Sequence, residues 1–510
     1  MKKLKNKFVL SVIPLISFSM FIWGCSSGDS EEKEKIIPPS ISMQEISEIT
    51  YNSAVANFTV TVGSKGLSIV GIRYVLEGSS DTLDITYDIP DTKVSIKMDG
   101  LKRMSKYSVY AYAKTIDNLV YKSSIKSFTT HDGEKPNLSQ IELLERTTES
   151  VKVSCTAESS QDFPITEMGY YLSKDSEMTN KEKITLENLN TEIGSLVPRK
   201  AYFIQAYAIN EIGESTSETF LFETKSLKGE WAYAFSTNGR FRAIAASNGE
   251  NLYFGLGTHG SNALQDWNKY NVKDKTVTTL NAFPGSVEPG SGGNGAFCIN
   301  NTIYVTCRDN SFWAYDIEGD SWKQKSNTSG ERNHHIALAA DGKGFYGLGE
   351  FYKTDLWEYD SSANSWTLAT NAPFSWFSRH AVFSIGEDIY FEYRFEDDSE
   401  FYKYNTKNKQ WTILKKFPGI ATLDTFGFSI GTRGYVVVGL YNVNGSSEYT
   451  TELWEYSPLY DEWEKKTDYP IKAVGVTGGA VGDKAYVGCG ATYSSAGYPF
   501  ADFYEFDPDK

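Results

Sequence analysis

Alternation of apolar and polar residues recurs through most of this chain, and it predicts short strands joined by tight turns. Residues 107–113 (YSVYAYA) alternate in this way, with Tyr107 and Val109 on one face and Ser108 on the other. A hairpin is expected at residues 381–392, where two apolar runs flank the turn sequence GED. We therefore predict an all-β protein.

The C-terminal half repeats one pattern, in which an aromatic residue is paired with a second anchor residue. A ring is followed seven residues later by a second anchor, and each repeat of about 44 to 52 residues has room for four short strands. A four-stranded sheet has two apolar faces to bury, and radial stacking of several such sheets buries them. The five complete pairs are Tyr270/Val277, Tyr315/Trp322, Tyr359/Trp366, Tyr404/Trp411 and Tyr456/Trp463.

A sixth copy of the pattern is split between the two ends of this region. It opens at Phe506, but the chain ends at Lys510, before the second anchor. The missing anchor is Trp231, which stands ahead of the first complete copy. An array that ends within a repeat and begins with the missing fragment is expected to close into a ring, with the strand around Trp231 completing the last sheet.

The repeats also resemble a known family. Residues 355–360 (DLWEYD) followed by Trp366, and residues 452–456 (ELWEY) followed by Trp463, resemble the kelch repeat. The resemblance implies a six-bladed kelch β-propeller, which we place at residues 227–510. Kelch repeats carry a Gly-Gly pair after the second strand, and no intact pair is found at the positions assigned to it: Leu256-Gly257, Cys307-Arg308, Gly349-Glu350, Tyr393-Arg394, Val438-Gly439 and Cys489-Gly490.

The middle of the chain holds a second repeat, of about 95 residues. We predict two antiparallel β-sandwiches, at residues 38–131 and 132–226, that act as spacers. The spacing from Leu101 to Tyr107, and from Leu196 to Tyr202, resembles the tyrosine corner of fibronectin type III domains. The early core Trp of that family is absent from both copies, so we describe them as fibronectin type III-like.

The N-terminus reads as an export signal. Lysines precede an apolar run from Phe8 to Ile22, a layout typical of a secretory signal peptide, which we place at residues 1–24. Gly24-Cys25 resembles a bacterial lipobox, although Trp23 departs from it, and implies acylation of Cys25, for example with palmitate. The alternative is an ordinary signal peptide with an incidental cysteine.

Residues 26–35 (SSGDSEEKEK) are polar and charged, and we predict a flexible tether at residues 25–37. Their acidic start resembles the export signal of surface lipoproteins in Bacteroidetes. The prediction is an outer-membrane lipoprotein at the cell surface, with the membrane as a partner through the lipid anchor.

Composition narrows the possible partners. The formal net charge of −15 repels phosphate backbones, so nucleic acid is not an expected partner.

We predict buried free thiols rather than disulfides, because Cys298 would face Ile303 across a hairpin. No metal or cofactor is predicted, since the neighbours His334 and His335 would point to opposite sides of a regular strand.

Charged residues at equivalent blade positions form the candidate site. They are expected near one rim of the central channel, where five arginines would make a positive focus and two loop aromatics would offer stacking surfaces. The alternative is that Glu350 simply neutralises its Arg neighbours. The candidate residues are Arg242, Arg308, Arg332, Glu350, Arg379, Arg394, Trp376 and Tyr493.

Two classes of function fit this sequence. The first is a binding protein that presents the propeller face to a glycan or a protein ligand. The second is a sugar-modifying enzyme. The motif of copper radical oxidases resembling galactose oxidase is not found, whereas the six-bladed sialic acid mutarotase type implies Arg and Glu near the axis, where Arg308, Glu350 and Arg394 are in line. Whether the chain is an enzyme stays open at this point.

Overall fold

The computed structural model describes residues 35–87, 92–287, 294–375, 377, 379–395, 398–492 and 498–510. The predicted signal peptide and Cys25 lie outside them. The described chain forms two compact units. The first unit is 1–136 with 159–166 and 209–214, and the second is 137–158, 167–208 and 215–510. All regular elements in the described ranges are strands, in agreement with the predicted all-β class.

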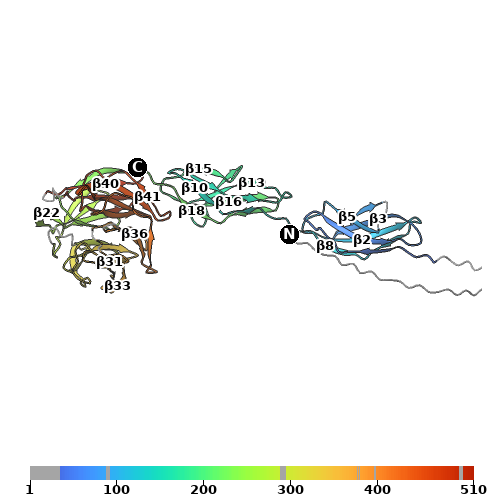
Figure 1. Ribbon diagram of the computed structural model, residues 1–510, viewed down its shortest axis with the longest axis horizontal. Coiled ribbons are helices and arrows are strands. Elements are labelled where there is room, and N and C mark those ends of the chain that lie inside the picture. Colours follow the sequence, from blue (N-terminus) through green and yellow to red (C-terminus); the bar gives the residue numbers. More distant parts are fainter. Residues whose placement is uncertain are drawn as a thin grey trace, which may run out of the picture. The chain divides into compact units, whose positions relative to one another are not determined.

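The first unit is built around a two-sheet sandwich (Figure 1). Strand β2 alternates buried and half-exposed residues along its whole length, as its sequence AVANFTVT predicts. Phe58, Ile72 and Val109 from the two sheets meet in one core. One sheet contains β1 (Ser40–Met43), β2 (Ala54–Thr61) and β5 (Lys93–Met98), and the other β3 (Leu67–Leu76), β4 (Thr82–Tyr87), β6 (Lys106–Thr115), β7 (Val120–Lys122) and β8 (Lys126–Thr129).

The second sandwich repeats this strand order. Its three-stranded sheet contains β10 (Glu142–Arg146), β11 (Val151–Ser154) and β15 (Thr191–Ile193). Its five-stranded sheet contains β13 (Glu167–Ser173), β14 (Glu182–Leu186), β16 (Ala201–Asn210), β17 (Gly213–Thr216) and β18 (Phe220–Glu223). A short pair joins β9 (Asn137–Leu138) to β12 (Ala157–Glu158).

The tyrosine of the repeated leucine and tyrosine spacing makes the same local hydrogen bond in both sandwiches. The Tyr107 hydroxyl accepts a hydrogen bond from the backbone N–H of Lys102 at 2.8 Å. The Tyr202 hydroxyl accepts one from Val197 at 3.0 Å. Both tyrosines are buried. Each tyrosine therefore holds the turn that precedes its strand.

Residues 230–507 form six four-stranded antiparallel sheets (Figure 1). The first three are β20 (Ile244–Ser247), β21 (Asn251–Gly255), β24 (Trp267–Asn271) and β25 (Thr276–Leu280); β26 (Gly295–Ile299), β27 (Thr302–Thr306), β28 (Phe312–Asp316) and β29 (Ser321–Gln324); and β30 (Ile336–Ala340), β31 (Lys343–Gly347), β32 (Asp355–Asp360) and β33 (Ser365–Asn371). A small two-stranded hairpin, β22 (Thr258–His259) with β23 (Asn262–Ala263), lies in the connection between β21 and β24.

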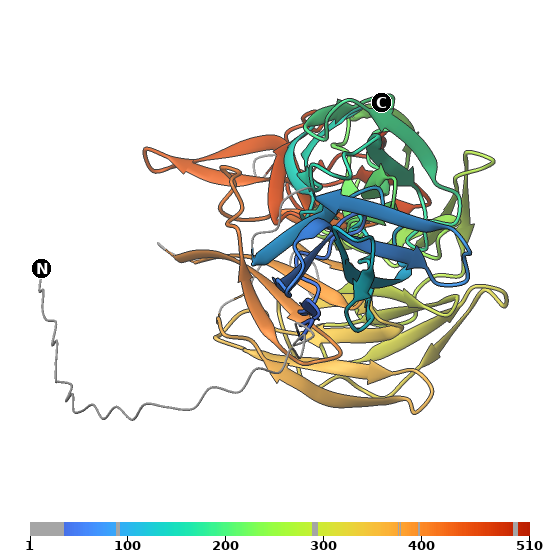
Figure 2. The same cartoon turned by 90° about the vertical axis from the view of Figure 1, so that its right-hand side faces the viewer.

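The next three sheets complete the set. They are β34 (Val382–Ile385), β35 (Asp388–Phe395), β36 (Asp398–Asn405) and β37 (Trp411–Leu414); β38 (Phe426–Ile430), β39 (Arg433–Val443), β40 (Ser446–Ser457) and β41 (Glu462–Lys465); and β42 (Thr477–Val481), β43 (Lys484–Gly488), β44 (Asp502–Asp507) and β19 (Glu230–Ser236). The long β39–β40 hairpin, orange-red in Figure 2, extends beyond its own sheet.

The sheets close into a ring. Their first strands contact one another in cyclic order, from β20 through β26, β30, β34, β38 and β42 back to β20. The last sheet takes its outer strand from the start of the region, because β19 pairs with β44 and sets Trp231 opposite Phe506. The fold is a β-propeller, and the predicted pairing of its first and last strands is present.

The seven-residue spacing of the aromatic anchors follows from the hairpin between the third and fourth strands. Tyr315 lies directly opposite Trp322 in this hairpin, with ring centroids 4.9 Å apart. The indole N–H of Trp322 then donates to the carbonyl of Asn281 in the preceding sheet at 2.9 Å. Trp231 donates to Thr467 in the same way at 3.0 Å. These two tryptophan anchors therefore tie their own sheets to the neighbouring ones.

The four described cysteines are free, as predicted, and Cys155, Cys307 and Cys489 are buried, whereas Cys298 is only half-buried. Cys298 lies opposite Ile303 in the pairing of β26 with β27. Burial raises the pKa of the Cys307 thiol to about 12 and that of Cys489 to about 12, so both act as small apolar groups.

Candidate functional site

A polar cavity of about 240 Å³ opens where the first strands of the propeller begin. Every sheet contributes to its wall from the segment just ahead of its first strand. The contributing residues, in ring order, are Arg242, Asn294, His334, Arg379, Asp424 and Gly475.

Five of these wall positions share an unusual backbone conformation. Their φ angles are 54° at Arg242, 51° at His334, 60° at Arg379, 55° at Asp424 and 61° at Gly475. Left-handed φ costs roughly 1–2 kcal/mol for a residue other than glycine, and such strain tends to gather at functional sites. The ring therefore places a residue with positive φ at the cavity in five of its six sheets, and in four of them this residue is not glycine.

This turn also explains why two adjacent histidines reach the same cavity. His334 and His335 both line it, which contradicts the expectation that they face opposite ways. The expectation assumed a regular strand, but β30 begins only at Ile336. The left-handed φ of His334 breaks the alternation before the strand starts.

The two histidines have different surroundings. His334 Nδ1 lies 2.8 Å from Glu350 Oε1, and its buried Nε2 has no hydrogen-bond partner among the described residues. Burial and the positive charge of Arg242 lower the pKa of His334, although Glu350 opposes this. His335 Nε2 lies 2.8 Å from the Thr306 hydroxyl, and burial lowers the pKa of His335 to about 4. Both rings are thus favoured in the neutral form.

A second histidine and carboxylate pair lies at the floor of the cavity. His380 Nδ1 lies 3.4 Å from Oε2 of Glu392, a carboxylate that is only 1% exposed. Thr425 donates its hydroxyl to the same oxygen at 3.0 Å. Arg394 Nε lies 3.7 Å from Glu392 Oε1. Because His380 and Thr425 line the cavity, this buried cluster connects the floor to a charge that solvent does not reach.

The cavity continues into the central channel. A second space of about 390 Å³ shares His380, Val382 and Thr425 with the first. Its walls are mainly small residues of the first strands, such as Ala296, Ala337, Ala339, Gly479 and Ala480. The channel below the histidines is therefore lined mainly by small, uncharged side chains.

Arg332, predicted as a site residue, does not line the cavity. Its guanidinium is 4% exposed and forms an ion pair with both carboxylate oxygens of Asp355. Burial would raise the pKa of Asp355, but the bonds from Arg332 and from the Trp357 indole outweigh it and lower that pKa to about 2. Arg240 forms the same arrangement with Asp266. Arg332 thus shares the position of Arg240, two residues before the cavity wall, and His334 holds the position that matches Arg242.

The sequence alone assigns Gly349-Glu350 to the position of the kelch Gly-Gly pair, and the structure shows that this assignment is one residue too far along the chain. Backbone pairing sets Glu350, not Gly349, opposite Asn333, just as Thr258 lies opposite Phe241. Gly349 therefore corresponds to Gly257, and Glu350 lies one residue beyond the pair. This extra step lets the Glu350 carboxylate reach His334.

The remaining predicted residues are distributed as follows. Arg242 and Arg379 lie on the cavity, and Arg379 pairs with Asp424 at 3.3 Å. Arg394 serves the buried Glu392 and lies outside the wall. Arg308 is half-buried, and its carbonyl accepts the N–H of Arg332 at 3.2 Å. Trp376 and Tyr493 lie outside the described residues.

Sequence reasoning missed His334, His380 and Asp424. A usable signal was present, because each precedes the first strand of its sheet by two residues, as Arg242 does in the first sheet. Arg332 was selected because it is an arginine like Arg242, although it lies four residues before its strand and not two. No group of His, Cys, Asp and Glu in the described ranges is arranged to hold a metal ion. Nor does any described helix have the length and apolarity to cross a membrane.

Comparison with known proteins adds one finding. No family model matches the chain, and no curated protein matches it. A solved structure titled "Structure of YjhT" is similar at 15% sequence identity and a TM-score of 0.46, over 52% of this chain and 95% of that one. A likeness at this level says nothing about the ligand.

Proposed function

We propose that this chain is a lipid-anchored binding protein that presents a six-bladed, kelch-type propeller to a small acidic glycan. In this proposal Cys25 carries the anchor at the cell surface, and residues 25–37 form the tether. The fibronectin type III-like sandwiches at residues 38–131 and 132–226 lead to the propeller at 227–510. The cavity at the channel mouth holds the ligand.

The observation that carries the proposal is the wall of the cavity. One residue from each of five sheets is held at positive φ around it. A packed channel plug would not require residues other than glycine at these positions, because glycine could fill the same backbone position without strain. Instead four of the five positions carry two Arg, one His and one Asp, which are groups that recognise polar ligands, and only the fifth is a glycine, Gly475.

The size and charge of the cavity favour a single acidic sugar unit. Its volume of about 240 Å³ is below the ~300–1,000 Å³ of drug-sized sites. Arg242 and Arg379 can grip a carboxylate or sulfate, and Asp424 can accept hydrogen bonds from sugar hydroxyls. The positive focus is weaker than five arginines would give, since Arg332, Arg379 and Arg394 lie next to Asp355, Asp424 and Glu392.

The orientation of the second sandwich is consistent with presentation. The cavity is formed by segments that precede the first strands. The sandwich contacts the opposite face, at the β38–β39 turn through Glu223 and Arg433 and at the β40–β41 turn through Arg146 and Glu462. The mouth therefore points away from the side at which the chain enters the propeller.

A second candidate function is a sugar-modifying enzyme, and the two histidine and carboxylate pairs favour it. His334 with Glu350 and His380 with Glu392 are combinations that transfer protons in many active sites. An enzyme would change a bound sugar during incubation, for example by faster exchange between its anomers in NMR spectra, and the change would depend on His380.

Binding can be tested directly with purified protein. Titration calorimetry with glucuronate, galacturonate and glucose 6-sulfate is expected to show heat of binding that uncharged glucose does not give. Arg242→Ala should remove it, while Arg103→Ala, an exposed residue of the first sandwich, should not. Equal binding of glucose and glucuronate would reject the acidic ligand.

The anchor needs a separate test, because Cys25 lies outside the described residues. Two or more acyl chains hold a protein firmly where one does not. Cell fractionation of a Cys25→Ala variant is expected to move the protein out of the membrane fraction. Retention equal to that of the unmodified chain would refute the lipid anchor.

A further inference from the structure

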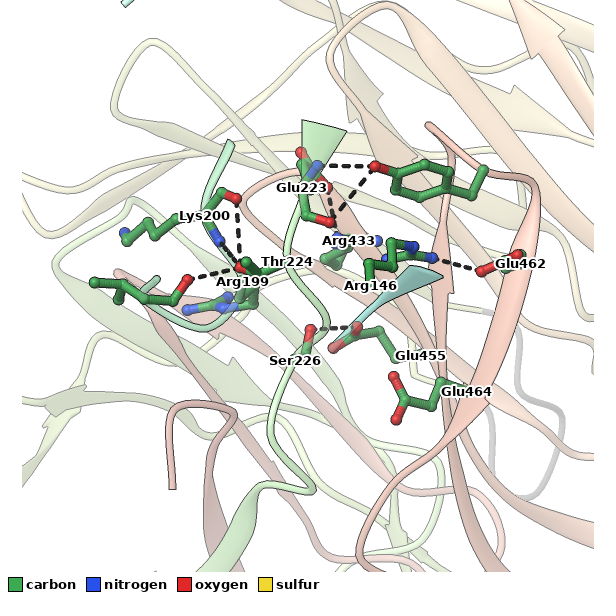
Figure 3. Close-up of polar contacts among 12 residues, drawn as sticks. Arg146, Arg199, Lys200, Glu223, Thr224, Ser226, Arg433, Glu455, Glu462 and Glu464 are labelled. Atoms are coloured by element: carbon green, nitrogen blue, oxygen red, sulfur yellow. Dashed lines mark hydrogen bonds and ion pairs between the residues drawn. The ribbon is translucent and has the colours of Figure 1, made fainter. Parts of the chain in front are cut away.

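The second sandwich meets the propeller through ion pairs whose arginines are largely buried (Figure 3). Arg433, 2% exposed, lies 2.5 Å from Glu223 at the end of β18. Arg146, 9% exposed, lies 2.5 Å from Glu462 and stacks its guanidinium 3.6 Å above the ring of Tyr460. The Tyr460 hydroxyl in turn accepts the backbone N–H of Glu223 at 2.8 Å. This contact is therefore a bonded interface and not a loose approach.

The segment that links the two parts is bonded at nearly every step. Ser226 donates to Glu455 Oε1 at 2.6 Å, and Tyr435 donates to Oε2 of the same carboxylate at 2.6 Å. Lys466, 1% exposed, lies 3.6 Å from Glu455 and donates to the carbonyl of Leu227 at 3.0 Å. The link between sandwich and propeller thus has little freedom to move.

The same interface holds both ends of the strand pair that closes the ring. On the N-terminal side, the bonded link runs directly into β19. On the C-terminal side, Arg199 of the sandwich binds Asp509 with two hydrogen bonds, of 3.0 and 2.9 Å, just after β44. The N–H of Gly229 also donates to the carbonyl of Lys510 at 2.9 Å. The sandwich therefore grips the first and the last strand of the ring together.

Ring closure is the step of this fold that needs such help. Strands β19 and β44 come from opposite ends of the ring sequence, and pairing them closes the longest loop in the propeller, which costs conformational entropy. A buried ion pair adds little net stability against apolar packing, but its partners specify one arrangement. Several of these pairs therefore favour a single placement of the closing strands.

We propose that the second sandwich is the clasp of the propeller, which holds its closing strands β19 and β44 in register, and not a spacer. The proposal concerns the face opposite the cavity and does not depend on which ligand binds. Its consequence is that weakening the interface loosens the closing strands before the other sheets.

Hydrogen exchange on the full chain tests the clasp. The double variant Arg199→Met with Arg433→Met is compared with Arg73→Met, which breaks an exposed ion pair with Asp84 in the first sandwich. Amides of β19 and β44 are expected to exchange at least about tenfold faster in the double variant. Amides of β28 and β32 should be unchanged, and the control should match the parent throughout.

Two outcomes would overturn the proposal. One is unchanged protection of β19 and β44 in a folded double variant, and the other is an equal loss of protection across all six sheets. If the double variant does not fold, the single variant Asp509→Asn, which alters one exposed partner, is measured instead and should loosen the same two strands. The exchanged pair Arg199→Asp with Asp509→Arg is expected to restore protection, whereas a purely structural defect would persist.

Discussion

On the face of the propeller that receives the second sandwich, Arg433 meets Glu223 and Arg146 meets Glu462, and each pair joins two parts of the fold. On the channel-mouth face, similar side chains surround a cavity. There, His334 keeps a buried nitrogen without a hydrogen-bond partner among the described residues. On the sandwich face these charged side chains are paired within the chain, whereas at the channel mouth His334 Nε2 can form a hydrogen bond with a ligand.

The same contrast occurs within the mouth itself, between positions two residues apart. Arg240 and Arg332 turn into the sheets and pair with aspartates, whereas Arg242 and His334 turn to the cavity. Residue type does not separate these roles. What separates them is the distance from the first strand and the presence of an Asp at the start of the third.

The largest expected effect tests the closed face of the ring. Deleting residues 226–236 removes β19 and leaves β44 without its outer partner. The half-buried Trp231 loses its packing against Tyr469 and Phe506, and the exposed strand edge adds to the cost. We expect thermal unfolding to lose its single cooperative step. Deleting residues 26–34 serves as the control, and equal melting temperatures for both deletions would contradict closure by this strand.

The next effect separates the two kinds of arginine. Arg332→Ala leaves Asp355 without its ion-pair partner and is expected to lower the unfolding free energy by about 3 kcal/mol, with glucuronate affinity unchanged. Arg242→Ala is expected to weaken that affinity at least about tenfold, or ~1.4 kcal/mol, and to leave chemical denaturation nearly unchanged. Reversed results would mean that the roles of the two positions are exchanged.

A smaller effect is expected at Gly475. Its Cβ position lies 2.5 Å from the Phe241 ring and 3.1 Å from Arg242 Cγ, so Gly475→Ala should displace Arg242 and weaken ligand binding. We expect a loss of about 2 kcal/mol in stability from strain and crowding together. Gly431→Ala is the matched control, because Gly431 has φ of 58° but open space around it. A control that loses ligand equally would argue against crowding at Arg242.

The smallest effect concerns pH. Burial lowers the pKa of His335 to about 4 in the folded protein, against about 6.5 in the unfolded chain. Between these values the unfolded state binds the proton and the folded state does not, so stability falls as pH falls. From pH 7 to 5.5 this amounts to about 1 kcal/mol. Denaturation curves of His335→Gln should lack this dependence, and those of His131→Gln, an exposed residue, should keep it.

The sequence by itself determined the features that local geometry controls. The seven-residue step from Tyr315 to Trp322 places two residues opposite each other in one hairpin, whatever surrounds it. The step from Leu101 to Tyr107 brings a hydroxyl to a turn within the same segment. The split repeat at Trp231 and Phe506 likewise required closure, since neither end can bury its sheet alone.

Only the tertiary structure decided which charges face the cavity. Arg332 finds Asp355 on another strand, and Arg379 finds Asp424 in the next sheet. The direction of a charged side chain follows from these distant partners, because burying it without one is costly. Backbone pairing likewise sets Glu350, and not Gly349, opposite Asn333, so that the Glu350 carboxylate reaches His334. The sequence alone does not align these two segments.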